Sequence, residues 1–167
     1  RVLFRSFRQE CINVANDIAN VATKPIAVSF SGGTDSQAIC LSFIEAKVPF
    51  TAVIASLYDK AGTIINSHDT KRAYQFCIDH NIPWEEHKIY LDTFYKTTGV
   101  KYAKEYGFWN VEALVHTSII DSLNNEYCYV SGEGSFNVMP YNGDATPDLN
   151  LPTIDRKSTR LNSSHTD

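Results

Sequence analysis

The strongest constraint on the fold is an alternation of short apolar runs with longer amphipathic stretches, which repeats four times along the chain. The short runs have the length and the β-branched residues of buried strands, whereas apolar residues three and four apart in the longer stretches indicate helices. Alternation of this kind is typical of a parallel sheet with helices on both faces. We therefore predict an α/β fold, a Rossmann-like doubly wound parallel sheet in three α/β/α layers.

The predicted elements follow one another without an internal repeat. The first helix ends near Thr23, and Pro25 separates it from the first strand because proline cannot continue a helix. Pro49 and Pro83 mark the starts of the next two strands. The predicted strands cover 26–30, 50–57, 84–91 and 127–130, and the predicted helices cover 4–23, 35–46, 68–80, 92–107 and 111–123.

The segment that carries chemistry lies directly after the first predicted strand and reads S-G-G-T-D-S, from Ser31 to Ser36. Its two glycines let the backbone turn sharply, so that successive N–H groups can point at one cluster of anionic oxygens. The following helix adds the partial positive charge of its N-terminus, and the short hydroxyl side chains add donors. A parallel sheet binds its ligand at the carboxyl ends of its strands, which is where this loop lies. We predict a phosphate-binding loop.

Asp35 would repel a phosphate unless a cation lies between them, so the loop predicts bound Mg²⁺ shared with phosphate oxygens. The plainer alternative is an acid that only stabilises the start of a helix. No lysine follows the glycines, as the lysine-containing P-loop would require, and the G-x-G-x-x-G spacing of dinucleotide-binding loops is also missing.

The S-G-G-x-D-S loop resembles the PP-loop of the ATP pyrophosphatase superfamily, whose fold is the HUP-type, adenine nucleotide alpha-hydrolase-like one. These enzymes hold the β,γ-pyrophosphate of ATP, so that attack falls on the α-phosphate and gives an adenylate and pyrophosphate. The resemblance implies ATP and Mg²⁺ as cofactors and a small-molecule acceptor.

A second segment after the fourth strand, from Val130 to Gly134, reads V-S-G-E-G and is similar to a glycine motif in the synthase domain of asparagine synthetases. Within the superfamily, the chain is most similar to that domain. The synthetases continue with an acidic pair where this chain has Ser135, Phe136 and Asn137, which puts asparagine in doubt as the product. A glutaminase domain or subunit outside this chain is the implied partner.

The resemblance assigns roles to individual positions. Asp35 and Glu133 are the expected catalytic residues, and Asp35 is the expected Mg²⁺ ligand. Adenine is expected to meet backbone groups at the end of the second strand. The expected nucleotide-binding residues are Ser29, Ser31, Gly32, Gly33, Thr34, Asp35, Ser36, Ile54, Ala55, Ser56, Leu57 and Gly132.

The implied function is an Mg-ATP-dependent, AMP-forming ligase that activates a carboxylate-like acceptor for a nitrogen nucleophile. One alternative is a protein like phosphoadenylylsulfate reductase, or another sulfur-transfer member of the superfamily. A second alternative is a non-catalytic module that binds adenine nucleotides, although such relatives of the fold lack the S-G-G-x-D-S loop.

Composition limits the partners and the cellular location that we expect for this chain. The net charge of −4 argues against nucleic acid as a partner, and no apolar run reaches the length of a membrane span. The four cysteines form neither a zinc pair nor a disulfide framework, so we expect free thiols and a cytoplasmic protein.

The two ends of the chain are expected to be unnatural. Residues 155–167 begin D-R-K-S-T-R-L-N-S-S-H, which is similar to the in-frame translation of a common sequencing adapter. We exclude this stretch from fold reasoning. The expected domain covers residues 1–154, a PP-loop ATP pyrophosphatase domain truncated at both ends.

Overall fold

The structure is a computed structural model that describes residues 6–107 and 111–132. Its sheet contains β1 (Ile26–Ser29), β2 (Thr51–Tyr58), β3 (Trp84–Tyr90) and β4 (Cys128–Val130), all parallel, in the order β3-β2-β1-β4. The chain adds β2 and β3 on one side of β1 and then returns to add β4 on the other side. The predicted doubly wound parallel sheet is therefore confirmed.

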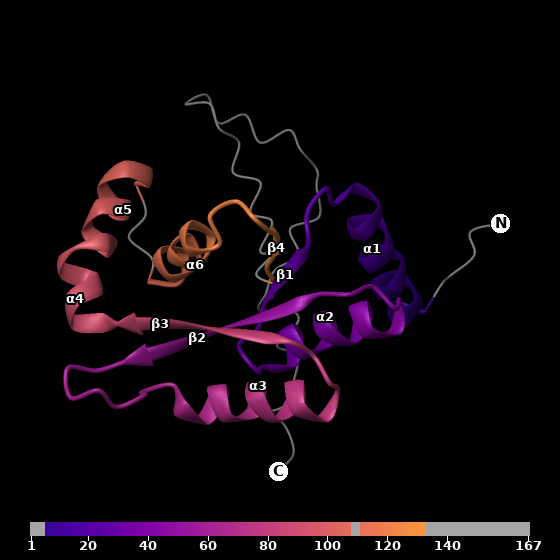
Figure 1. Cartoon of the computed structure of the whole chain (residues 1–167), viewed down its shortest axis with the longest axis horizontal. Helices are drawn as coiled ribbons and strands as arrows, with labels where there is room; N and C mark the ends of the chain where they lie inside the picture. Colours follow the sequence, from indigo (N-terminus) through magenta and orange to yellow (C-terminus); the bar gives the residue numbers. More distant parts are fainter. Residues whose placement is uncertain (1–5, 108–110, 133–167) are drawn as a thin grey trace, which may run out of the picture. The chain divides into compact units, whose positions relative to one another are not determined.

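The helices lie on both sides of this sheet. As Figure 1 shows, α2 (Thr34–Glu45) and α3 (Ser67–Asp79) cover one face, called here the α3 face, and α6 (Val111–Ser122) covers the other, the α6 face. The remaining helices are α1 (Phe7–Val21), α4 (Leu91–Lys96) and α5 (Thr98–Tyr106). None of the helices in the described part of the chain is long and apolar enough to cross a membrane.

The prediction that residues 92–107 are helical is confirmed, but the segment forms two helices, α4 and α5, which are separated at Thr97. Thr97 has φ −124° and ψ −90°, and its hydroxyl donates to the carbonyl of Thr93. The break lets Gly99 pack against Phe94, where an added Cβ would lie 3.1 Å from the Phe94 carbonyl oxygen. Tertiary packing thus divides a stretch whose weak periodicity carried no sign of a break.

Successive residues of β1 and β2 point to opposite faces, as in any strand. Val28 and Ile54 are buried on the α3 face, whereas Ala27 and Val53 are buried on the α6 face against Ile119. The core on the α3 face contains more buried residues than the core on the α6 face. Its buried members are Ala15, Ile26, Val28, Phe30, Cys40, Phe43, Phe50, Ala52, Ile54, Ala73, Cys77 and Ile82.

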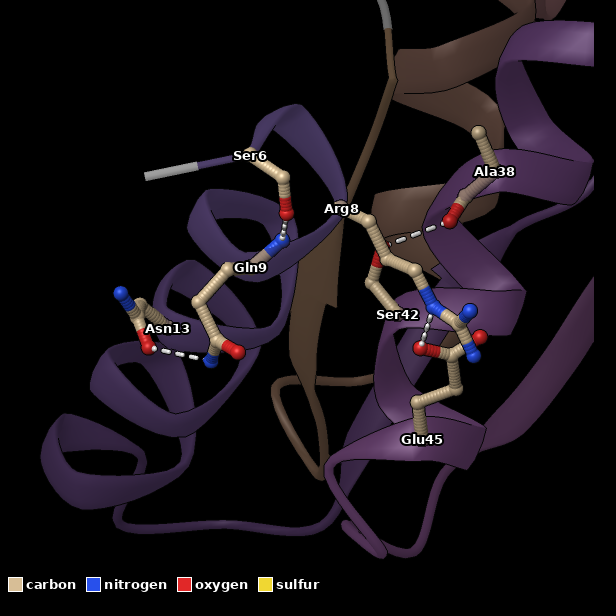
Figure 2. Close-up of polar contacts among 7 residues, drawn as sticks. All are labelled: Ser6, Arg8, Gln9, Asn13, Ala38, Ser42 and Glu45. Carbon is tan, nitrogen blue, oxygen red and sulfur yellow. Dashed lines mark hydrogen bonds and ion pairs between the residues drawn. The ribbon is translucent and has the colours of Figure 1, made fainter. Parts of the chain in front are cut away.

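Helix α1 begins at a capped end and lies beside α2 (Figure 2). The Ser6 hydroxyl accepts a hydrogen bond from the Gln9 amide, which supplies one of the free N–H groups of the first turn with a partner. Arg8 then forms an ion pair with Glu45 at the end of α2, with 2.7 Å between nitrogen and oxygen. Ala15 is buried in the α3-face core, so α1 holds the helix that carries the predicted phosphate loop.

Candidate functional site

The two glycine segments end on the same edge of the sheet. Because β1 and β4 are parallel with Val28 beside Val130, Ser131 and Gly132 continue level with Ser29 and Phe30. The winding of the chain reverses between these two strands, and a doubly wound sheet binds ligands at such a reversal. The structure therefore brings the predicted loop and Gly132 to one edge of the sheet.

Gly32 fixes the loop on α3. Its φ is +80°, in the left-handed region that favours glycine, and an added Cβ would lie 2.6 Å from the carbonyl oxygen of Asp69 and 2.9 Å from the amide nitrogen of Ala73. Both are backbone atoms of α3 and cannot move aside. The position accepts no side chain, for a reason that lies entirely within the fold.

Gly33 is different. It is the N-cap residue of α2 with an ordinary φ of −77°, and an added Cβ would meet only the Ser31 hydroxyl, at 3.4 Å. No side chain caps the start of α2. Nothing in the fold requires glycine here, so the space over its backbone suits a ligand that approaches closely. A helix start with uncovered N–H groups favours an anion such as phosphate.

Hydrogen bonds brace the loop from within. The Ser31 hydroxyl accepts from the Gly33 amide at 3.4 Å and lies 3.2 Å from the Ser36 hydroxyl, which is 3.0 Å from the Gly33 carbonyl. Ser36 is buried, so its hydroxyl serves the loop's own shape in this structure. Gln37 donates to the Gly32 carbonyl at 2.9 Å, a clamp that sequence reasoning missed because a glutamine after the motif carries no distinctive signal.

Thr34 and Asp35 are exposed in the first turn of α2, where both can reach a bound ligand. Among the described residues no group of three or more acidic, histidine or cysteine side chains is placed to hold a metal ion. A lone carboxylate beside a phosphate loop nevertheless fits Mg²⁺, which commonly takes one or two carboxylates and completes its shell with phosphate oxygens and water. The donor set suits an ion shared with a nucleotide.

The four residues expected to meet adenine divide into two pairs. Ile54 and Ser56 are buried with their side chains toward α3, and the Ser56 hydroxyl lies 3.2 Å from that of Tyr74. The backbone N–H and C=O groups of Ala55 and Leu57 point to the edge of β2 that faces β1. There the carboxamide of Asn66 donates to the Ala55 carbonyl at 2.8 Å and accepts from the Leu57 amide at 2.9 Å. Asn66 is a residue that sequence reasoning missed.

The remaining predicted residues lie around this edge. Ser29 is the last residue of β1 and is half-buried. Gly132 lies against α2, where an added Cβ would meet the side chain of Ile39. Glu133 lies outside the described residues, so its catalytic role stays a prediction, as does the domain boundary at residue 154.

The buried thiols lie behind the loop, in the α3-face core. Burial raises the pKa of Cys40 to about 12, with a further contribution from Cys77, and burial raises the pKa of Cys77 to about 11. Thiols with such pKa values remain protonated near neutral pH and are poor nucleophiles. All four cysteines are free, as expected, and Cys11 and Cys128 are half-buried.

Neither a protein-family model nor a curated protein matches the chain. Solved structures do match. The NH3-dependent NAD synthetase of Campylobacter jejuni subsp. jejuni NCTC 11168, solved in complex with the nitrate ion, aligns over 76% of this chain with 13% identity and a TM-score of 0.52. The chain has the fold of this synthetase. It spans 55% of the length of the synthetase chain, so it corresponds to about half of that enzyme.

Two further structures match less well. The NMN synthetase of Francisella tularensis aligns over 73% of this chain and 51% of its own, with 16% identity and a TM-score of 0.46. A predicted subunit of tRNA methyltransferase from Methanocaldococcus jannaschii DSM covers 71% of this chain and 57% of its own, with 16% identity and a TM-score of 0.43. The special likeness to asparagine synthetases stays a prediction.

Proposed function

We propose that the chain is the nucleotide-binding part of a PP-loop ATP pyrophosphatase, an enzyme that activates a carboxylate-like acceptor as its adenylate for attack by a nitrogen nucleophile. The observation that carries the proposal is the contrast between the two glycines. Gly32 is required by the packing of the loop on α3, whereas an added Cβ at Gly33 would meet only the Ser31 hydroxyl, so packing within the fold does not explain the second glycine.

In this function the loop holds the pyrophosphate of ATP by its backbone N–H groups, with the hydroxyls of Ser31 and Thr34 beside them. The start of α2 adds a favourable potential for the negative charge that the leaving pyrophosphate develops. The internal bonds of Ser36 and Gln37 keep the donors in place before the ligand arrives. Preorganised donors and correct positioning supply most of the rate enhancement in a reaction of this type.

Asp35 would hold Mg²⁺ against the phosphate oxygens, where the ion, when bound, neutralises charge on the leaving pyrophosphate. Its exposed place in the first turn of α2 leaves the carboxylate available to such an ion.

We further propose a nitrogen nucleophile of the ammonia type, a choice supported by the NH3-dependent synthetase that shares the fold. Glu133, on the segment that follows Gly132, is the proposed contact to the adenylate and acceptor. An asparagine-synthetase-like specificity, with ammonia delivered by a glutaminase domain or subunit, is the finer form of this proposal. The cytoplasm is its proposed location.

The position of cleavage tests this function. The full-length protein is incubated with Mg²⁺, ammonia, a panel of carboxylic acceptors, aspartate included, and ATP labelled at the α- or the γ-phosphate. We expect the α-label in AMP or an adenylate and the γ-label in pyrophosphate. Asp35→Ala should abolish this turnover and stay folded, because an exposed acid in a first turn contributes at most ~1 kcal/mol to stability. Asp17→Ala, which removes an exposed carboxylate from α1, should keep full turnover.

Release of ADP and phosphate would contradict the proposal. So would full turnover by a folded Asp35→Ala protein. Tight ATP binding without cleavage under any acceptor would favour the non-catalytic module instead, and a sulfur-containing product would favour the sulfur-transfer alternative.

A further inference from the structure

On the side of β1, the carboxyl end of β2 runs past the last residue of β1 that pairs with it, and this stretch of its backbone edge, from Ala55 to Leu57, is called here the notch. Strand β1 is paired with β2 only as far as Ser29 beside Val53, and the Phe30 amide then donates to the Val53 carbonyl at 2.9 Å. Beyond that point β1 turns away into the phosphate loop, and the backbone of β2 needs other partners. The Ile65 amide donates to the Leu57 carbonyl at 2.9 Å, and the Asn66 carboxamide bonds to the Ala55 carbonyl and the Leu57 amide.

The bonding pattern in this notch is that of a planar group with a donor and an acceptor side by side. The Ala55 carbonyl takes one N–H of the carboxamide, and the Leu57 N–H takes its oxygen. Adenine carries the same pair of groups, since its 6-amino donor lies next to a ring-nitrogen acceptor. Asn66 therefore occupies the two backbone groups that an adenine edge would use.

The notch is close to the loop. The Asp69 carbonyl is the atom against which Gly32 packs, and the Asp69 amide donates to the Asn66 carbonyl at 3.1 Å. One turn of helix, about 5 Å of rise, thus separates the residue in the notch from the contact with the phosphate loop. A base in the notch and phosphates on the loop can belong to one nucleotide.

Asn66 is also the N-cap residue of α3, a position where asparagine commonly accepts hydrogen bonds from the first-turn amides. Here its side chain makes no such bond, and the Asp69 amide donates to the Asn66 backbone carbonyl instead. In this structure the side chain therefore bonds to β2 and not to its own helix.

We infer that Asn66 is a specificity-determining gate, which closes the base notch of the free protein and exchanges with adenine when ATP binds. This inference rests on the proposed function. Since the closed form must open first, the gate lowers the apparent affinity for ATP by the fraction of molecules that are open, and it does not affect a ligand without a base.

The test compares ATP with inorganic tripolyphosphate by titration calorimetry on the wild-type protein and its variants. Asn66→Ala opens the notch. Asn66→Asp removes one of the two bonds, because a carboxylate cannot donate to the Ala55 carbonyl but can still accept from the Leu57 amide. In Asn66→Ala we expect the affinity for ATP relative to tripolyphosphate to rise about tenfold, the worth of two competing neutral hydrogen bonds. In Asn66→Asp we expect a smaller rise of the same ratio.

A matched control is Asn16→Ala, which removes an asparagine that bonds within α1, and it should leave the ratio unchanged. A triphosphate of purine riboside, which lacks the 6-amino group, should lose most of the gain. In the wild-type protein, ATP but not tripolyphosphate should shift the side-chain amide resonances of Asn66.

The possible failures are distinguishable. Tripolyphosphate binding with an unchanged or lower ATP ratio in both variants would overturn the gate and leave the phosphate loop standing. Binding of neither ligand to the wild-type protein would overturn the proposed function, and the gate with it.

Discussion

The two faces of the sheet are held in different ways. On the α3 face, rings pack against one another: the Phe43 and Phe50 centroids are 5.5 Å apart, and those of Phe30 and Phe76 are 5.2 Å apart. The α6 face has a smaller apolar core and no comparable pair of phenylalanine rings among the described residues. A histidine bonds across it from strand to helix: His87 on β3 lies 2.9 Å from the hydroxyl of Ser118 on α6.

This difference bears on the candidate phosphate loop, whose supporting contacts all lie on one face of the sheet. The loop leaves β1, enters α2 and packs on α3 through Gly32, so all its supports belong to the apolar α3 face. Close apolar packing resists small displacements, which suits donors that must stay in place. The α6 face contains the half-buried imidazole of His87 instead, and its stability should respond to pH.

The largest effect is expected from the centre of the α3-face core. Phe43 is 1% exposed, and Phe43→Ala should lower the free energy of unfolding by about 3–5 kcal/mol through lost burial and the remaining cavity. Leu41→Ala, on the same helix but 37% exposed, is the control and should cost far less. Denaturant unfolding measures both. A similar loss in the two variants would show that burial in the α3-face core is not what makes Phe43 stabilising.

A smaller effect should separate the two glycines. Gly32→Ala forces a side chain into a left-handed conformation and against the α3 backbone, so we expect a loss of about 2–3 kcal/mol in unfolding free energy. Gly33→Ala should cost less, up to about 1 kcal/mol, because alanine is a poorer N-cap residue than glycine but its Cβ meets no backbone atom here. Calorimetric ATP binding should nevertheless weaken in the Gly33 variant. Equal stability losses in the two variants would contradict the distinction.

The smallest effect concerns the α6 face. Burial lowers the pKa of His87 below its ordinary value of 6.5, so the unfolded chain binds a proton more readily than the folded chain. Stability from this group is complete above pH 6.5 and is lost as the pH falls below that value. The melting temperature should therefore drop between pH 7.5 and 5.5, and His87→Gln should flatten this dependence. The same slope in the variant would assign the effect to other groups.

Much of the fold was predictable because it depends on local patterns. Strand and helix alternation, and the position of the loop between β1 and α2, can be read from apolar spacing and two adjacent glycines. The described helices and strands confirm those predictions, apart from the division of α4 from α5 at Thr97. That break depends on Gly99 meeting Phe94, and such a contact leaves little trace in a local pattern.

The sequence by itself determined the order of the elements, the layers of the sheet and the place of the candidate phosphate loop, because these follow from local periodicity and chain connectivity. The tertiary structure alone distinguished Gly32 from Gly33, since only the approach of α3 makes one glycine indispensable to the fold. It also decided the partners of Asn66. No local pattern assigns a partner to this residue, but the edge of β2 takes its side chain, because Ala55 and Leu57 lie beyond the last pairing of β2 with β1.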